Sequence, residues 1–258
     1  MRTCKESIVG LVLEDESPEY LMKRVAEAAP ELSWVDLVIF NHYLQGGILL
    51  RLRKKPHTDE KLQAFADFVT RGDIQPIVKD ATHELYVELG TGKGDFITQI
   101  AERNPQINFI GLEVEATVVL AAARKVREKN LNNVRLIVFD VENIAELFSE
   151  HEVDRLYINF CDPWPKKRHA KRRLTHVRFL ELYKRILKPG GEIYFKTDNR
   201  GLFDYSLEQF ALTGFEVRDV TFDLHSDEPP ENIRTEYENK FSAAGVPINF
   251  CIARFANG

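Results

Sequence analysis

Short apolar runs alternate with longer amphipathic segments from residue 84 to residue 255. The apolar runs predict seven strands, at residues 85–89, 109–112, 134–139, 156–160, 193–196, 215–222 and 249–255. The segments between them carry apolar residues at helical spacing and predict helices at 95–103, 116–129, 143–149, 177–187 and 202–213. Strands that alternate with helices indicate βαβ units, so we expect an α/β fold with a doubly wound, mostly parallel seven-stranded sheet. Only a polar loop and a short polar segment separate the last two strands, which predicts one antiparallel strand near the C-terminus.

The first part of the chain has a different pattern. Apolar residues at helical spacing predict a packing helix over residues 61–69. Residues 1–49 carry no motif, so we expect an N-terminal extension at 1–49 followed by one folded domain at 50–258. The extension is either an accessory element or an in-frame segment upstream of a start near residue 50, and the sequence leaves both open.

Length and composition favour one α/β domain with an appendage, because 258 residues that are 44% hydrophobic and 29% charged can bury a substantial core. No apolar run approaches the ~18 residues of a membrane span, and the first residues have no signal-peptide pattern. Cys4, Cys161 and Cys251 form no C-x-x-C motif, so we expect a reducing, cytoplasmic location. The net charge of −5 means that any surface for nucleic acid must be a local basic patch.

The strand predicted at 85–89 leads into a glycine-rich turn with the spacing E-x-G-x-G-x-G. Gly90, Gly92 and Gly94 alternate, so the backbone can turn sharply and lie close to a ligand. The spacing differs from the G-x-G-x-x-G of dinucleotide-binding folds and from the phosphate-binding G-x-x-x-x-G-K-[ST]. A ligand site and an ordinary strand-to-helix turn both fit this stretch alone, so its surroundings decide between them.

Four of the predicted strands end near an acidic residue, namely Glu88, Glu113, Asp140 and Asp162. In an open parallel sheet, ligands bind at the carboxyl ends of the strands. Glu113 lies about 20 residues past the turn, where a carboxylate can accept both hydroxyls of a ribose, and Asp140 can accept from an adenine amino group. Acidic residues beside the turn suit a cationic ligand, so we expect S-adenosylmethionine, which joins an adenosine to a sulfonium. Each acid could instead cap a helix, but the four together favour a site.

A basic run follows Asp162-Pro-Trp-Pro, and six of its eight residues from Lys166 to Arg173 are Lys or Arg. The prolines stiffen the turn and hold Asp162 in a fixed direction. A charge run is usually a solvated face, but this one follows a candidate catalytic acid in an acidic protein, which favours contacts with a phosphate backbone. His169 has no second His or Cys at metal spacing nearby, so we expect a polar contact there and no metal site.

Two later segments complete the candidate residues. Asp198 ends a predicted strand, where it would face the same crevice as Asp162 or cap the helix that follows. Residues 234–240 predict a surface loop and a short amphipathic helix.

The motifs together resemble one family. The segments V-E-L-G-T-G-K-G, F-I-G-L-E, N-F-C-D-P-W-P-K-K-R-H, F-K-T-D-N-R-G-L-F and T-E-Y-E are similar to those of the bacterial tRNA (guanine-N7)-methyltransferases, over about residues 50–255. The resemblance implies a Rossmann-like methyltransferase fold. It also implies that S-adenosylmethionine is used to methylate a guanine in the variable loop of tRNA. Nothing carries over from the family to residues 1–49.

The resemblance also implies roles for individual residues. It implies cofactor contacts at Glu88, Gly90, Gly92, Gly94, Glu113, Asp140 and Asp162. It implies substrate contacts at Lys166, Asp198, Thr235, Glu236, Tyr237 and Glu238. It implies RNA contacts at Arg168, His169, Lys171, Arg172 and Arg173.

The chemistry of guanine N7 needs no strong base, because this nitrogen has a free lone pair and no proton. We expect Asp162 to be the catalytic residue, which orients the guanine edge and offsets the positive charge that develops on the ring. Cys161 offers a different chemistry, that of a thiol nucleophile, although strand alternation points it away from Asp162.

Two other functions stay open. One is a methyltransferase that acts on another base or on a small molecule, and the basic run argues against the small molecule. The other is a non-catalytic RNA-binding scaffold, and the set of four acids argues against it. We expect tRNA as the partner, no membrane partner, and either a monomer or a homodimer.

Overall fold

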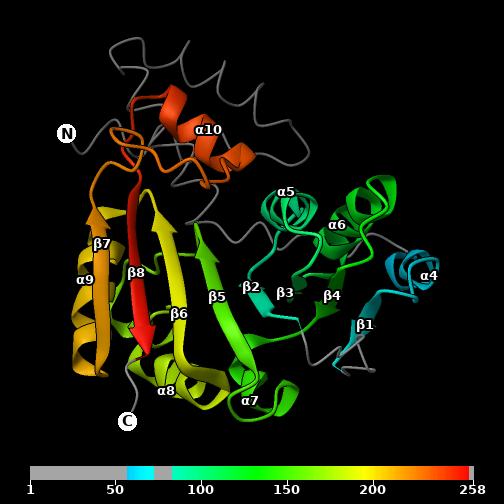
Figure 1. Cartoon of the computed structure of the whole chain (residues 1–258), viewed down its shortest axis with the longest axis horizontal. Helices are drawn as coiled ribbons and strands as arrows, with labels where there is room; N and C mark the ends of the chain where they lie inside the picture. The colour runs from blue at the N-terminus through cyan, green and yellow to red at the C-terminus, as the bar shows by residue number, and fades with distance from the viewer. Residues whose placement is uncertain (1–56, 73–82, 256–258) are drawn as a thin grey trace, which may run out of the picture. The chain divides into compact units, whose positions relative to one another are not determined.

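The computed structural model describes residues 57–72 and 83–255 (Figure 1). The chain divides into two units, Met1–Arg53 and Lys54–Gly258, and the fold below is that of the second unit. The extension predicted at 1–49 lies outside the described residues. Within the part of the chain that the structure describes, no helix has both the length and the hydrophobicity needed to cross a bilayer.

One eight-stranded sheet organises this unit. Its strands, in the order in which they lie side by side, are β1 (Val69–Arg71), β4 (Val134–Val138), β3 (Asn108–Glu113), β2 (Leu85–Leu89), β5 (Val153–Asn159), β6 (Leu187–Thr197), β8 (Asn249–Phe255) and β7 (Phe215–Thr221). All neighbouring pairs are parallel except those of β8, which runs antiparallel to both β6 and β7. The predicted mostly parallel sheet with one antiparallel strand near the C-terminus is therefore confirmed.

The seven predicted strands are all present, and the structure adds an eighth. The helix predicted over residues 61–69 is wrong in its second half, because α4 (Thr58–Gln63) ends early and Val69 starts β1. Val69 is buried and pairs with Leu136 of β4. A strand of three residues is too short to show an alternating pattern, so its one apolar residue, Val69, extended the helical spacing that precedes it.

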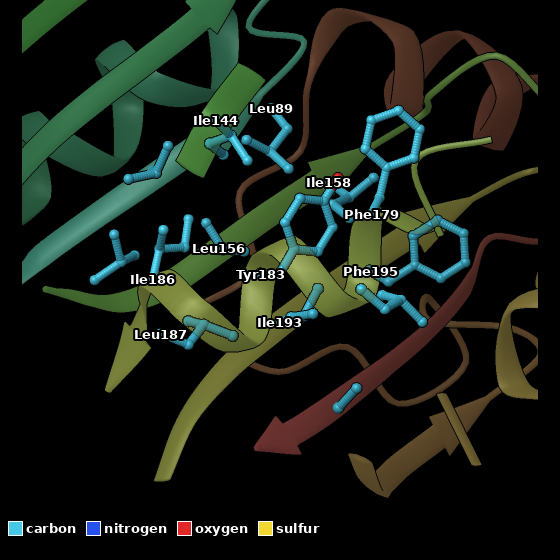
Figure 2. Packing of buried hydrophobic residues seen from close by; sticks show 14 of the residues in the cluster. Leu89, Ile144, Leu156, Ile158, Phe179, Tyr183, Ile186, Leu187, Ile193 and Phe195 are labelled. Carbon is cyan, nitrogen blue, oxygen red and sulfur yellow. The ribbon is translucent and has the colours of Figure 1, made fainter. Parts of the chain in front are cut away.

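Helices cover both faces of the sheet, as a doubly wound fold requires. One face packs against α7 (Ile144–Leu147), α8 (Val177–Ile186) and α9 (Arg200–Leu212). The other face packs against α4, α5 (Asp95–Arg103) and α6 (Ala116–Glu128). Figure 2 shows the core of the first face, where Phe179 and Tyr183 of α8 lie in one buried cluster with Ile158 and Phe195 of the sheet.

Three short elements follow strand ends. They are the 3₁₀ helices η1 (Val141–Asn143) and η2 (Lys167–Arg172), and the α-helix α10 (Glu236–Ala243). Phe241 of α10 forms a small separate core with Leu224 and Ile248, and the partly buried Phe160 and Tyr237 pack against it. Since Phe160 directly follows β5, this small core holds α10 near the carboxyl end of that strand (Figure 1).

The direction in which the chain adds strands reverses between β2 and β5. From β2 the chain builds β3 and β4 on one side, and then β5 and β6 on the other. Ligands of open α/β sheets bind at such a reversal, beyond the carboxyl ends of the strands. Glu88 of β2 lies opposite Tyr157 of β5, so the acid that precedes the glycine turn is next to the last residues of β5.

Gly111 of β3 lies under the glycine turn with no room for a side chain. A Cβ atom at this position would lie 2.5 Å from Thr91 Oγ1, 2.9 Å from Leu136 Cδ2 and 3.0 Å from Ile97 Cδ1. Gly111→Ala is therefore expected to lower the free energy of unfolding by about 1–3 kcal/mol, the usual cost of overpacking. Urea denaturation measures this loss.

The matched control is Gly201→Ala in α9. The nearest atom to a Cβ there is Asn199 Oδ1 at 3.5 Å, which is ordinary contact. Because Ala has a higher helix propensity than Gly, this substitution should be neutral or stabilising. Equal losses in the two variants would contradict the packing account of Gly111.

Candidate functional site

The glycine turn joins β2 to α5, and hydrogen bonds from its backbone N–H groups to β3 hold it in place. The N–H groups of Gly90 and Thr91 both donate to the carbonyl of Leu112, at 2.9 and 3.0 Å. Gly90, Gly92 and Gly94 have φ values of 77°, 57° and 80°, a backbone region that residues other than glycine rarely adopt. A Cβ on Gly90 would meet nothing within 4 Å, so open space lies beside the backbone there.

The third glycine has a different role. A Cβ on Gly94 would lie 2.8 Å from Ala122 Cβ on α6, so the absence of a side chain lets α5 pack closely on α6. At Gly90 and Gly92 the backbone is open to a ligand, and contacts between the three glycines and the cofactor stay predictions.

Glu88 is a buried carboxyl at the floor of this turn, with 4% of its surface exposed. Asn159 Nδ2 donates to Glu88 Oε1 at 3.1 Å, which links the ends of β2 and β5. Burial raises the pKa of Glu88 to about 8. Glu88 Oε2 and Asn159 Oδ1 are both buried and have no hydrogen-bond partner among the described residues. Two buried polar atoms without a partner beside an open glycine turn fit a ligand that brings hydrogen-bonding groups to them.

Glu113 and Asp140 lie at the ends of the next two strands. Glu113 accepts from the N–H of Gly92 at 3.1 Å and from that of Glu115 at 3.1 Å, so it is tied to the glycine turn. Asp140 caps η1 by accepting from the N–H of Glu142 at 3.0 Å, the helix-capping role that the sequence left open. Each carboxylate oxygen has a second lone pair, so these bonds leave both acids able to accept from a ribose or an amino group.

Asp162, Asp198 and Tyr237 come together from three separate segments. Burial, and then the negative charges of Asp198 and Asp162, raise the pKa of Tyr237 to about 12, so its hydroxyl keeps its proton at neutral pH. The Tyr237 ring packs on Phe160, with 5.5 Å between ring centres. Two carboxylates and one hydroxyl donor therefore share one location at the carboxyl edge of the sheet.

Cys161 directly precedes Asp162 in sequence but turns into the protein. Its side chain packs against the core of α7, α8 and α9. Burial, and then the charge of Asp162, raise the pKa of the Cys161 thiol to about 12. A thiol that stays protonated is a poor nucleophile, so this geometry disfavours the covalent chemistry considered from sequence.

Arg173 fixes the Asp162-Pro-Trp-Pro turn from inside. Its guanidinium donates to the carbonyl of Pro163 at 3.0 Å and to that of Trp164 at 3.1 Å, and it stacks on the Tyr205 ring at 4.3 Å. Trp164 has a φ of 42°, an uncommon conformation for a residue with a side chain. The Arg173 hydrogen bonds hold this strained turn in place, and a contact between Arg173 and RNA stays a prediction.

The other basic residues of the run face solvent. Lys166, Lys167, Arg168, Lys171 and Arg172 are all exposed, on and beside η2. None of them forms an ion pair with a carboxylate of the described residues. Arg172 stacks over the Trp164 ring at 4.8 Å, and His169 packs edge-on to the same ring. This exposed set of unpaired cations starts four residues after Asp162.

The segment from Thr235 to Glu238 starts α10. Thr235 is its N-cap and accepts from the N–H of Glu238 at 2.9 Å. Glu238 is fully buried, with its Oε2 bound to Lys196 Nζ at 2.7 Å. Glu238 Oε1 accepts from Asn232 Nδ2 and faces His225 Nε2, both at 2.9 Å. Glu236 is exposed, so the four residues differ in what they offer a substrate.

The comparisons with known proteins agree with one another. A family model described as "Putative methyltransferase" (Methyltransf_4) matches residues 82–251. The tRNA (guanine-N(7)-)-methyltransferase of Macrococcus caseolyticus is 45% identical to this chain over 210 residues, which cover 80% of this chain and 100% of that protein. The chain belongs to the tRNA (guanine-N7)-methyltransferase family. The enzyme of that name from Bacillus subtilis is 45% identical over 204 residues, 77% of this chain and 96% of its own length.

Solved structures of other methyltransferases have the same fold as this chain. The 16S rRNA methyltransferase KamB has a TM-score of 0.52 at 13% identity, over 68% of this chain and 90% of that chain. The aminoglycoside resistance methyltransferase NpmB1 has a TM-score of 0.50 at 18% identity, over 68% and 89%. The Rossmann-like methyltransferase fold that the sequence predicted is therefore confirmed.

Two residues of this family member's site were missed in the sequence. Asn159 ends β5 and holds Glu88, and its position directly before Phe-Cys-Asp was the available signal. Lys196 ends the apolar run Ile-Tyr-Phe, where a buried lysine needs a partner. Neither motif nor spacing identifies that partner, because Glu238 is 42 residues away.

A cavity of about 780 Å³ opens beside the site rather than in it. It runs along the sheet face at Tyr157 and Tyr194, and Arg155 stacks on Tyr194 at 4.2 Å. Asn159, Lys196, Thr221 and Phe250 connect it to the carboxyl edge, but none of the four predicted acids lines it. The chemistry of the family therefore has to be sought at the strand ends and not in this cavity.

One cluster of possible metal ligands lies behind α10. Ligand atoms of His225, Glu228 and Glu238 lie within 4.8 Å of one another. The two carboxylates already pair with cations, Glu238 with Lys196 and Glu228 with Arg234. These side chains supply the positive charge that a metal ion would supply, and the prediction of no metal stays a prediction.

Lys196 tethers the α10 segment to the sheet. Its ammonium donates to Asn232 Oδ1 at 3.0 Å, to the carbonyl of Ile233 at 2.9 Å and to Glu238. Lys196→Met should lower the free energy of unfolding by about 3–5 kcal/mol, because it leaves a buried carboxylate without its cation. Urea denaturation measures the loss.

The double variant Lys196→Met/Glu238→Gln supplies the control. It removes both charges, so it should cost less than the sum of the two single substitutions. Additive losses would show that the two side chains stabilise the protein independently.

Proposed function

We propose that this protein transfers the methyl group of S-adenosylmethionine to N7 of a guanine in the variable loop of tRNA. The observation that carries the proposal is the exposed basic surface of η2, which begins four residues after Asp162 at the edge where Glu88, Glu113 and Asp140 end their strands. A phosphate backbone on that surface would bring a base to Asp162. The relatives that cover 80% of the chain carry this activity in their names.

The cofactor supplies an electrophilic methyl group on a sulfonium when it is bound. Glu88, Glu113 and Asp140 would hold it across the reversal point, beside the open backbone of Gly90 and Gly92. Its adenosine end belongs at Glu113 and Asp140, which keep free acceptor capacity.

Asp162 and Asp198 would face the guanine. The N1–H and amino groups of guanine are donors, and two carboxylates are matched acceptors for them. As N7 takes the methyl group, the ring becomes cationic, and fixed negative charges close to it stabilise that change. Tyr237, whose hydroxyl keeps its proton near these two carboxylates, would border the same base. Holding the base in line with the methyl group is the main contribution, since N7 needs no general base.

The assay is methylation of an unmodified tRNA transcript, followed by mapping of the modified nucleotide. A methyl group on N7 of a variable-loop guanine is the expected product. A methyl group on another base or atom would replace the proposal with a methyltransferase of different specificity. Cofactor binding without any methylated RNA would favour the alternative of a non-catalytic RNA-binding scaffold.

Asp162→Ala should reduce kcat by roughly 100-fold or more, the usual loss when one electrostatic group is removed from a transition state. The dissociation constant of S-adenosylmethionine should change much less, because the carboxylate acts mainly on the guanine. Asp162→Asn keeps the shape and removes the charge, so it should be nearly as slow. Full activity in either variant would remove the Asp162 charge from the mechanism.

Replacing Arg168, Lys171 and Arg172 together by Ala should raise the KM for tRNA and flatten its dependence on salt. Each phosphate contact that is lost should reduce the logarithmic slope by roughly one unit. Arg173→Ala should instead lower kcat with an unchanged slope, because its guanidinium holds the turn around Trp164.

The matched control removes three exposed charges from other surfaces, as in Arg124→Ala/Lys129→Ala/Arg185→Ala. This triple variant should keep the salt slope of the parent protein. The same flattening in both triple variants would show that net charge, and not the basic run, controls binding.

Three predictions stay open beside this function. The oligomeric state is a monomer or a homodimer, and a cytoplasmic location is an expectation from cysteine usage. Residues 1–49 are proposed to be dispensable for catalysis, because every candidate residue follows residue 50.

A further inference from the structure

Asp162 and Asp198 lie beyond the ends of two neighbouring strands. The last pair between β5 and β6 joins Asn159 to Lys196, and the N–H of Phe160 then donates to the Lys196 carbonyl at 2.9 Å. Asp162 comes two residues after this bond, and Asp198 comes after the last residue of β6. Contacts outside the sheet must therefore help to set the distance between the two carboxylates.

The position of Asp198 follows from the start of α9. Asp198 lies between Thr197, the last residue of β6, and Asn199, the N-cap of α9. The Asn199 N–H donates to Thr197 Oγ1 at 3.1 Å, and Asn199 Oδ1 accepts from the N–H of Leu202 at 2.8 Å. A contact that holds the Asp162 turn to α9 therefore also holds it to Asp198.

Arg173 and Tyr205 make such a contact. The Arg173 guanidinium donates to the carbonyls of Pro163 and Trp164 in the turn, at 3.0 and 3.1 Å. The same guanidinium lies 4.3 Å from the centre of the Tyr205 ring on α9. Tyr205 in turn packs against the buried core of α7, α8 and α9. The turn is thus connected to α9 through one planar cation.

The turn depends on these bonds because its backbone is strained. Trp164 has a left-handed φ of 42°, and Phe160, just before the turn, has one of 51°. Residues with side chains keep such conformations only where the surrounding structure imposes them. A guanidinium offers several N–H donors in one rigid plane and a flat face that stacks, whereas a lysine offers a single charged nitrogen. The shape of Arg173 therefore matters as well as its charge.

We propose that Arg173 and Tyr205 are positioning residues, whose stack sets the Asp162 turn against Asp198 so that the two carboxylates meet the edge of one guanine. The inference rests on the proposed function, in which both acids accept hydrogen bonds from that base. In this role Arg173 acts through the backbone of the turn, and Tyr205 acts through Arg173.

Inosine in place of the target guanosine tests this geometry. Inosine lacks the 2-amino group but keeps N7, so it removes one donor to the carboxylates and leaves the methyl acceptor in place. The parent protein should prefer the guanosine tRNA by at least roughly tenfold in kcat/KM, the cost of leaving a charged acceptor without its donor. Competition between the two tRNAs measures this ratio, which does not depend on how much of the protein is folded.

Tyr205→Leu and Arg173→Lys should each lower kcat by about tenfold or more, because small misplacements of reacting groups are costly. Each should also lower the preference for guanosine by at least about threefold, since a displaced carboxylate no longer pairs with the amino group. The KM for tRNA and its salt slope should stay near the parent values, because the charges of the basic run remain. The double variant should be no slower than Arg173→Lys alone, because Tyr205 acts through Arg173.

Two further variants serve as controls. Tyr205→Phe keeps the ring on which the guanidinium stacks, so it should keep the kcat and the preference of the parent protein. Thr175→Val removes the buried hydrogen bond between Thr175 Oγ1 and Ser206 Oγ, at 2.7 Å, which joins α9 to the segment after Arg173. This variant should lose stability and keep the preference for guanosine.

The outcomes separate the inference from the proposed function. An unchanged preference in Tyr205→Leu and Arg173→Lys, or an equal loss in Thr175→Val, would overturn the inference while the parent protein still methylates guanine N7. A flatter salt slope in Arg173→Ala would also overturn it, because that result would place the guanidinium on the RNA. A parent protein that methylates no guanine at N7, or that accepts inosine equally well, would overturn the proposed function or its recognition of guanine, and the inference with it.

Discussion

The reversal of strand order between β2 and β5 is the constraint on which the site depends. It places the carboxyl ends of the two central strands side by side, with β3 and β4 on one flank and β6 on the other. Acids that are far apart in sequence then meet at a single edge of the sheet. The glycine turn keeps that edge open, because Gly90 has no side chain to fill the space above β2.

Buried charge is the second feature that organises this edge. Lys196 satisfies Glu238 and two groups of the preceding loop, so the segment that begins α10 is fixed to the sheet by one ammonium group. Glu88 lies nearby with a carboxyl whose second oxygen has no donor among the described residues. One buried acid is therefore fully paired and structural, while the other keeps the capacity to bind a ligand.

The sequence predicted features that depend on neighbouring residues, such as apolar runs and acids at strand ends. It did not predict contacts between residues that are far apart in the chain. Apolar runs identified seven strands, but β1 has three residues and was absorbed into a helix pattern. The acids at strand ends were found because parallel strands bring them together. Asn159 and Lys196 were missed, since their partners Glu88 and Glu238 come from other elements. Arg173 was grouped with the basic run by composition, and only its contacts with Pro163 and Trp164 distinguish it.

The position of β8 inside the sheet has a consequence for how the protein is made. This strand is the last in sequence, yet it lies between β6 and β7 rather than at an edge. The loop and helix that carry the partners of Lys196, residues 222–248, connect β7 to β8, and β8 pairs with both of its neighbours. The segment that binds Lys196 is therefore held at both ends only after β8 has inserted between two strands that precede it in sequence, so β8 pairing is a late, long-range step of folding.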